Sequence, residues 1–213
     1  MGIEVRRFTW NYLDSNMYVL MAEGQALAID PIDSEEVFDY LRSFHEITVL
    51  LTHEHFDHIC GLNRIRAERK CVVIAQEKCS ERIQNSKTNF SAMAETMLEL
   101  SGNKGKKIIE PFVCKKADIT FEEKMVLKWA GNDINIFSTP GHSPGSVCIS
   151  VGDKLFTGDS LLERGPMNRF PGGSDKRFRE KTIPILIKLL KNTDIIYPGH
   201  GVHFSPTLVN FHS

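Results

Sequence analysis

The chain has 213 residues, a formal net charge of −1, 41% hydrophobic residues and 25% charged residues. This composition is typical of a globular protein, and the length suits one domain spanning 1–213 with a substantial core. The near-zero net charge gives no electrostatic footprint for nucleic acid or for an anionic membrane surface, so neither is expected as a partner.

The apolar segments and the cysteines favour a cytoplasmic location. The longest apolar runs, at 48–51 and 183–187, fall far short of a membrane span, and the first ten residues lack the apolar core of a signal peptide. The five cysteines are scattered without a CxxC pair, which is typical of reduced thiols rather than of a disulfide framework. They are Cys60, Cys71, Cys79, Cys114 and Cys148.

The N-terminal part of the chain alternates predicted strands and helices. Alternating or continuous apolar patterns predict strands at 3–8, 16–22, 25–30, 47–51 and 71–75. A helix is predicted at 33–44, with Ser34 as its N-cap and acidic residues in its first turn. A second helix is predicted at 57–70, where apolar residues recur at helical spacing.

The C-terminal part continues the alternation after a less regular stretch at 77–116, in which only 92–100 has a clear helical pattern. Strands are predicted at 119–121, 125–129, 134–139, 146–151, 154–158 and 194–198. A helix is predicted at 175–191, and Pro184 in its interior predicts a kink or a later start. The whole pattern indicates one α+β domain in which strands pack beneath helices.

The segment "THEHFDH" at 52–58 directly follows a predicted buried strand. Residues two apart on a strand face the same way, so His53 and His55 can point at one position just past the strand end. Asp57 and His58 fall on the following turn, where they can diverge toward a second position. Imidazoles and a carboxylate suit zinc or a similar transition ion far better than calcium or magnesium. The alternative is a polar loop with surface histidines, which four candidate ligands in six residues disfavour.

Three later turns can complete a metal site. Each combines an apolar strand with a glycine-containing turn that carries one polar side chain, and these side chains are His142, Asp159 and His200. Loops at strand ends are where open sheets place functional groups. Catalytic zinc has three protein ligands and keeps a position for water, so a centre with two metals needs these additional groups.

With these residues in this order, nearly the whole sequence resembles the metallo-β-lactamase superfamily. The resemblance implies a four-layer αββα sandwich with two divalent metal ions at one edge, zinc being expected first and iron or manganese next. It assigns the motif residues to two metals and one bridge: His53, His55 and His142 to the first metal, Asp57, His58 and His200 to the second, and Asp159 to the bridge.

The same resemblance implies a hydrolase in which metal-bound hydroxide attacks a carbonyl carbon. Asp57 is the expected catalytic residue, because it could orient the hydroxide as well as bind metal. Position 55 is His, where the diiron flavoprotein branch of the superfamily has Glu, and this argues against that redox branch.

Two segments resemble the glyoxalase II-like branch, which hydrolyses thioesters such as hydroxyacylglutathione. They are "GDSLLERGPMNRFPGGS" at 158–174 and "KTNFS" at 87–91. Arg169 lies where that branch often has a basic residue near a substrate carboxylate, so it is a candidate substrate contact, with an ordinary surface arginine as the alternative. Glyoxalase II carries a C-terminal helical domain, whereas only 13 residues follow His200 here. The expected small-molecule substrate is therefore a smaller thioester or another ester.

Related activities remain as alternatives: a mononuclear iron persulfide dioxygenase, which uses only the first metal position, and a lactonase of the same superfamily. A nuclease would need a large inserted domain, and a non-catalytic metal-binding module is disfavoured because no expected ligand is missing. The sequence is compatible with a homodimer. We expect the stretch 77–116 to shape the mouth of the pocket, as a lid or as a dimer contact.

The remaining side chains with chemical potential are expected to have ordinary roles. Cys60 is expected to be a buried structural thiol. His203 is expected to lie at the surface or to support the site from outside, and His45 and His212 at the surface. Core packing is the expected role of the aromatic residues near the N-terminus, Trp10, Tyr12 and Tyr18.

Overall fold

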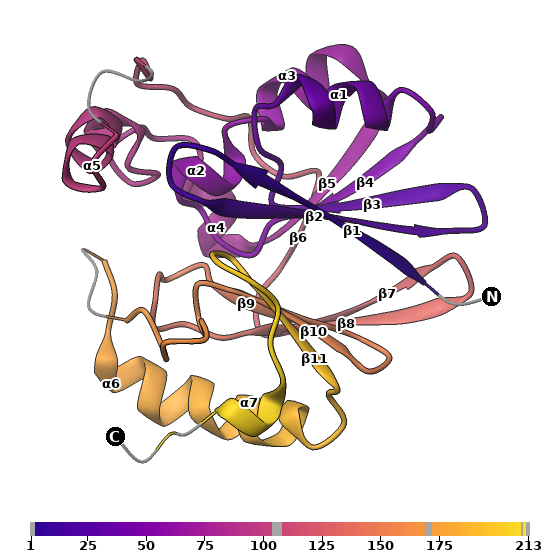
Figure 1. Cartoon of the computed structure of the whole chain (residues 1–213), viewed down its shortest axis with the longest axis vertical. Helices are drawn as coiled ribbons and strands as arrows, with labels where there is room; N and C mark the ends of the chain where they lie inside the picture. The colour runs from indigo at the N-terminus through magenta and orange to yellow at the C-terminus, as the bar shows by residue number, and fades with distance from the viewer. Residues whose placement is uncertain (1–2, 104–107, 169–171, 210, 212–213) are drawn as a thin grey trace.

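Two β-sheets stack face to face in the computed structural model, and helices cover the outer side of each sheet (Figure 1). The structure describes residues 3–103, 108–168, 172–209 and 211. The predicted α+β fold with an αββα order of layers is confirmed. None of the described helices is long and apolar enough to cross a bilayer.

The first sheet is antiparallel at its N-terminal end and parallel from β3 onward. In spatial order its strands are β1 (Glu4–Trp10), β2 (Ser15–Ala22), β3 (Gln25–Ile29), β4 (Ile47–Leu50), β5 (Cys71–Gln76) and β6 (Ile119–Phe121). Because β3 and β4 run parallel, their carboxyl ends meet at one edge, where 52–58 begins.

The second sheet brings the ends of three strands to that same edge. Its strands, in spatial order, are β11 (Ile195–Pro198), β10 (Lys154–Gly158), β9 (Val147–Val151), β8 (Asn132–Ser138) and β7 (Lys124–Trp129). Strands β7 to β10 alternate in direction and β10 pairs in parallel with β11. Strands β8, β10 and β11 therefore end together, just before His142, Asp159 and His200.

An apolar layer between the two sheets holds this edge together. Fully buried Leu20 and Leu27 of the first sheet belong to one packed cluster with Ile149 and Phe156 of the second. Tyr18 lies in the same layer, with its ring centroid 5.3 Å from that of Phe156, and its hydroxyl donates to the Pro198 carbonyl at 2.7 Å. Each such apolar side chain contributes roughly 1.5–3 kcal/mol on burial.

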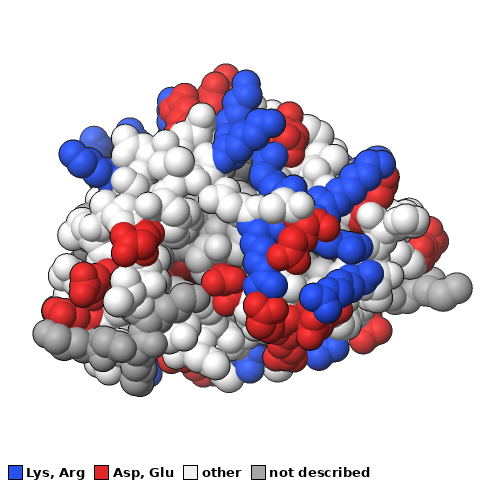
Figure 2. Space-filling model, turned by 90° about the horizontal axis from the view of Figure 1, so that it is seen from above, with Lys and Arg blue, Asp and Glu red and all other residues white. Residues whose placement is uncertain are grey.

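The helices lie in the outer layers. Those of the N-terminal half are α1 (Glu35–Leu41), α2 (Phe56–Ile59), α3 (Leu62–Glu68), α4 (Glu77–Arg82), η1 (Ser91–Met93) and α5 (Ala94–Leu100). The C-terminal half supplies α6 (Asp175–Arg177), η2 (Phe178–Thr182), α7 (Ile183–Leu190) and η3 (Pro206–Leu208). Lysines, arginines and acidic residues are interspersed on the face that carries α1 and α3 (Figure 2).

The predicted helix 57–70 is in fact two helices, α2 and α3, that meet at Gly61. A Cβ atom at Gly61 would lie 2.3 Å from the carbonyl oxygen of Ile32, so only glycine allows this close approach. Ser34 occupies the N-cap position of α1 as expected, but its side chain makes no capping hydrogen bond. Helix α4 was not predicted, because it buries only Cys79 and Ser80 and has no apolar periodicity.

Pro184 widens the predicted helix 175–191 rather than breaking it. Proline has no N–H for the carbonyl four residues earlier and its ring presses against that carbonyl, so the preceding turn becomes the π-helix η2. Thr182 in this turn donates to the Pro140 carbonyl at 2.7 Å. A Cβ atom at Gly141 would lie 2.6 Å from the Cβ of Phe178. The π-turn thus supports the loop that carries His142.

Candidate metal centre

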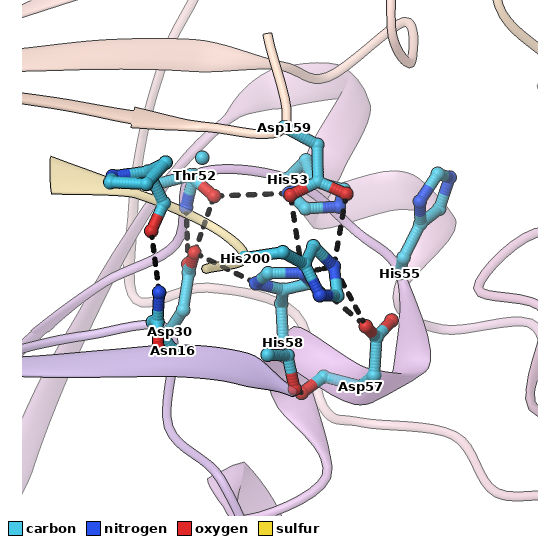
Figure 3. Close-up of polar contacts among 12 residues, drawn as sticks. Asn16, Asp30, Thr52, His53, His55, Asp57, His58, Asp159 and His200 are labelled. Atoms are coloured by element: carbon cyan, nitrogen blue, oxygen red, sulfur yellow. Dashed lines mark hydrogen bonds and ion pairs between the residues drawn. The ribbon is translucent and has the colours of Figure 1, made fainter. Parts of the chain in front are cut away.

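Seven polar side chains meet at the edge where β4, β8, β10 and β11 end (Figure 3). They are the residues predicted from the sequence: His53, His55, Asp57, His58, His142, Asp159 and His200. All but the half-buried His200 are at most 6% exposed. Such burial of so many polar groups is costly unless they are paired or bind a metal.

The first ligand set consists of His53, His55 and His142, with donor atoms within 4.8 Å of one another. His142 Nδ1 donates to the Met167 carbonyl at 2.5 Å, and His142 Nε2 lies 2.9 Å from His55 Nδ1. Thr52 Oγ1 donates its proton to Asp30, so it accepts from His53 Nδ1 at 3.0 Å. The Nε2 atoms of His53 and His142 are therefore lone-pair donors that face the cluster.

The second ligand set consists of Asp57, His58 and His200. His58 Nδ1 donates to Asp30 Oδ2 at 3.1 Å, and His200 Nδ1 donates to the Leu13 carbonyl at 2.9 Å. The Nε2 atoms of the two rings consequently face each other at 3.2 Å, and each lies 3.4 Å from Asp57 Oδ2. The two lone pairs repel each other unless a proton or a metal ion lies between them.

Asp159 lies between the two sets. Its Oδ2 is 3.5 Å from His142 Nε2 and 3.3 Å from His200 Nε2, while its Oδ1 is 3.5 Å from His58 Nε2. In Figure 3 the carboxylate of Asp159 lies on one side of the imidazole rings and that of Asp57 on the other. Gly199 makes room for this arrangement, since a Cβ atom there would lie 2.1 Å from Asp159 Oδ1.

The two sets differ in their protonation. Burial and the nearby His58 and His55 rings hold the pKa of His53 well below its usual value. Burial also lowers the pKa of His58, but the carboxylates of Asp57 and Asp159 outweigh it and raise that pKa to about 10. Burial raises the pKa of Asp159, yet His200 and His58 bring it well below its usual value. Without metal, His53 is therefore neutral near pH 7, whereas His58 holds a proton.

The donor atoms fit divalent metal ions. Among the described residues, His53 Nε2 and Asp159 Oδ1 are buried without a hydrogen-bond partner, a situation that costs roughly 1–3 kcal/mol per group. Nitrogen donors with two carboxylates suit zinc or a similar transition ion. Asp30, His53 and His58 also lie within ligand spacing. The Asp30 oxygens already accept from Thr52 and His58, so Asp30 orients ligands from behind.

A family model described as metallo-beta-lactamase superfamily matches residues 14–200, which include all seven clustered residues. The chain belongs to this superfamily. Membership and the His/Asp cluster together support divalent metal binding and a metal-dependent hydrolase.

Relatives of this superfamily chain include two kinds of named hydrolase. The probable metallo-hydrolase YqgX of Bacillus subtilis is 27% identical over 202 residues, which cover 92% of this chain and 89% of that protein. The hydroxyacylglutathione hydrolase of Shewanella loihica is 24% identical, and the match covers 88% of this chain and 62% of that enzyme. The chain thus matches less than two thirds of the length of the second relative.

Solved structures of the same superfamily share the fold. The BLEG-1 B3 metallo-beta-lactamase has a TM-score of 0.80 at 25% identity, with 96% of this chain and 95% of that chain covered. ETHE1 from Myxococcus xanthus has a TM-score of 0.69 at 20% identity, with 97% and 80% covered. The αββα sandwich is therefore shared over nearly the whole chain.

Sequence reasoning missed two buried acidic residues around the metal centre, Asp30 and Glu54. Asp30, directly after β3, accepts hydrogen bonds from His58 and Thr52. Its position directly after an apolar strand was the one feature of the sequence that could have predicted a role at the site. Glu54, fully buried, accepts from Arg82 of α4 at 2.5 Å and from Ser143 at 2.8 Å. These contacts tie the segment between His53 and His55 to α4 and to the loop after His142. Finding them required α4, which the apolar pattern does not reveal.

Of the remaining predictions from the sequence, some are confirmed, one is wrong and others concern residues that the structure does not describe. Arg169 lies outside the described residues. Cys60 is half-buried rather than buried, and its sulfur accepts from the Asp33 amide at 3.3 Å. The thiol is therefore less buried than predicted, although Cys60 still packs against the core. His203 and His45 are exposed, as expected, and His212 is outside the described residues. Trp10 and Tyr18 are core residues, and Tyr12 packs against Trp10.

A cavity of about 760 Å³ opens above the cluster. Its floor is polar and contains five of the clustered side chains: His55, Asp57, His142, Asp159 and His200. Residues of α5 and of the stretches after β1 and β10 form its walls. The stretch 77–116 contributes Met97, Leu100 and Ser101 to these walls. The candidate metal centre is therefore accessible to a small molecule.

Proposed function

We propose that this chain is a hydrolase with two divalent metal ions, most simply zinc, that cleaves a thioester or a related small ester. The observation that supports it best is that two ligand sets share Asp159 and open into one cavity. The proposed ligands are those of the two sets, with Asp159 bridging: His53, His55 and His142, and Asp57, His58 and His200.

Divalent metals, when bound, would lower the pKa of a water molecule and polarise the scissile carbonyl. The contribution of the chain itself is to position groups around that chemistry. Asp57 lies on the cavity floor, and its backbone carbonyl accepts from the Ser15 hydroxyl at 3.0 Å, which fixes its orientation. Its carboxylate can accept a hydrogen bond from the attacking water and hold it in line with the carbonyl.

The segment "KTNFS" supports the site rather than the substrate. Phe90 adopts a left-handed backbone conformation with φ of 63°, and its ring centroid lies 4.9 Å from that of His55. The Asn89 carbonyl accepts from the Phe56 amide at 2.8 Å, which fixes the start of α2. This segment thus accounts for the orientation of His55, while a substrate contact through Arg169 stays part of the proposal.

The thioester preference rests on the hydroxyacylglutathione hydrolase relatives, and three of these matches cover 54–62% of the relative's own length. We propose a smaller thioester or another ester as the substrate, and a cytoplasmic location for the enzyme. A lactonase would use the same residues on another substrate, whereas a persulfide dioxygenase would use only the first metal position.

Metal analysis of protein purified without added metal tests the proposal first. About two equivalents of metal per chain, with hydrolysis of thioesters that a chelator abolishes and zinc restores, is the expected result. A single equivalent of iron together with oxygen uptake in the presence of a persulfide would overturn it in favour of the dioxygenase. Hydrolysis of lactones alone would favour the lactonase. The Asp57→Ala variant should lose most of the activity.

A further inference from the structure

The cavity above the metal centre has apolar walls and a polar floor. Among the described lining residues, six apolar side chains rise around the ligands: Leu13, Met97, Leu100, Leu162, Pro166 and Met167. Leu100 is 84% exposed and Met167 is 38% exposed. Single exposed apolar residues are ordinary, but apolar residues grouped around a functional pocket indicate an apolar ligand.

One wall is a face of helix α5, on which Met97 is partly buried against the core and Leu100 is exposed. Ala94 and Leu98, four residues apart, are the buried side of this helix, while Met97 and Leu100 line the cavity. The helix is closed by Gly102 with φ of 78°, and the following Asn103 amide donates to the Leu98 carbonyl at 2.7 Å. The Asn103 side chain also donates to the Tyr12 carbonyl in the β1–β2 turn. The wall is therefore held in place at its C-terminal end.

The other walls are fixed to the metal ligands themselves. The Met167 carbonyl accepts from His142 Nδ1, and the Leu13 carbonyl accepts from His200 Nδ1. The backbone of each wall residue thus orients a histidine while its side chain lines the cavity. Paired hydrogen bonds between Leu162 and Gly165, at 2.9 and 3.1 Å, close the turn that carries the rest of this wall. The hydrogen bonds that orient His142 and His200 therefore also hold these wall residues in place.

The described charges at the rim are few and of both signs. They belong to Asp14, Glu163 and Arg164, all exposed, with a combined formal charge of −1. An uncharged apolar chain would gain from contact with the six apolar side chains.

We infer that the substrate of the proposed hydrolase carries an apolar chain next to the scissile carbonyl, and that Met97 and Leu100 of α5 select for it. This inference rests on the proposed function, since it names the substrate class of the same site. The chain can belong to the acyl group or to the leaving thiol, and both would contact the same walls.

Two series of thioesters test the inference with the metal-loaded enzyme. In one series the thiol is uncharged N-acetylcysteamine and the acyl group is acetyl, butanoyl, hexanoyl or octanoyl. In the other the acyl group is acetyl and the thiol is ethanethiol, butanethiol or hexanethiol. In at least one series kcat/KM should rise about two- to fourfold per added methylene, as expected for partial to full burial. S-lactoylglutathione should be a poorer substrate than the longest chains.

Matched variants assign the effect to α5. The double substitution Met97→Gln and Leu100→Gln should flatten the dependence of kcat/KM on chain length. Leu208→Gln is the control, because Leu208 is 60% exposed in η3 and does not line the cavity. It should keep the full dependence. Rates that do not depend on chain length in either series, or an unchanged dependence in the double variant, would overturn the inference.

Binding gives a second readout that does not need turnover. The octyl thioether of N-acetylcysteamine, which cannot be hydrolysed, should bind with a negative heat-capacity change in calorimetry, and the double variant should lose this binding. Its failure to bind the native enzyme would contradict the apolar pocket. Binding without hydrolysis of any thioester or ester would instead contradict the proposed function and leave the apolar pocket standing.

Discussion

The two ligand sets lie side by side and share Asp159, yet they differ in charge. The first set, His53, His55 and His142, contains only imidazoles, and burial holds the pKa of His53 well below its usual value. The second set contains the Asp57 carboxylate, and with Asp159 it raises the pKa of His58 to about 10. A metal ion therefore displaces no proton from His53 near neutral pH, whereas it must displace one from His58.

The hydrogen bonds behind the two sets show the same contrast. In the first set His142 is oriented by a neutral backbone carbonyl, and His53 by the hydroxyl of Thr52. In the second set His58 donates to the carboxylate of Asp30. A carboxylate behind an imidazole raises its basicity and strengthens its bond to a metal. We expect the second set to bind metal strongly at neutral pH and to lose it first in acid.

Removing the shared group should have the largest effect. Asp159→Asn keeps the size of the side chain but removes the charge that faces both sets, so both metals should bind more weakly. We expect kcat/KM to fall by roughly 10²–10³-fold or more, measured at saturating zinc. The control is Asp153→Asn, because Asp153 is exposed and directly precedes β10, the strand that Asp159 follows. This variant should leave activity and metal content unchanged. Full activity in Asp159→Asn would exclude a bridging role.

Removing one ligand of the second set should show whether the two sets bind metal independently. His200→Ala removes one of the three ligands of the second set and leaves the first set intact, because His200 contacts only Asp57, His58 and Asp159 among the clustered residues. We expect about one equivalent of metal to remain by elemental analysis and kcat/KM to fall roughly 10²-fold. His203→Ala is the matched control at an exposed histidine nearby. Retention of both equivalents would contradict the assignment of His200.

Weakening the support behind the second set should have a smaller effect. Asp30→Asn removes the negative charge that holds His58 Nδ1, so the affinity of the second set should fall by about 10–100-fold while that of the first changes less. Competition with a chromophoric chelator measures the two affinities. Asp133→Asn, an exposed aspartate on β8 that pairs with Lys128, is the control. An equal loss in both sets would indicate a general structural defect instead.

The sequence predicted the residues of both sets but not what lies behind them. The seven clustered residues were predictable because each follows an apolar strand in a recognisable motif. Asp30 also follows a strand, but its role depends on the parallel pairing of β3 with β4, which brings it to Thr52. The Glu54–Arg82 contact depends on α4, a helix too short and too polar for apolar periodicity to reveal. Support of this kind depends on tertiary pairing, which local patterns do not encode.

The dependence of metal affinity on pH is the most direct test of the contrast in charge. The pKa of His58 in the metal-free chain is about 10, so below that pH a proton must leave before metal binds to the second set. Its affinity should therefore fall as pH falls, by up to about tenfold per pH unit for one proton. The pKa values of His53 and His55 lie well below the usual value, so these two ligands should add little pH dependence to the first set between about pH 6 and about pH 8.

The free energy of unfolding of the metal-free protein should also depend on pH, and His58 and His53 should contribute in opposite directions. The raised pKa of His58 contributes stability that is fully present below the unfolded value of 6.5 and is lost as pH rises toward about 10. The lowered pKa of His53 acts in the opposite direction, because the unfolded chain binds a proton below 6.5 that the folded chain does not. Chelator competition and denaturant unfolding across this range measure both effects. Equal pH slopes for the two metal affinities would mean that the sets share one protonation equilibrium, and the contrast in charge would then belong to the cluster as a whole.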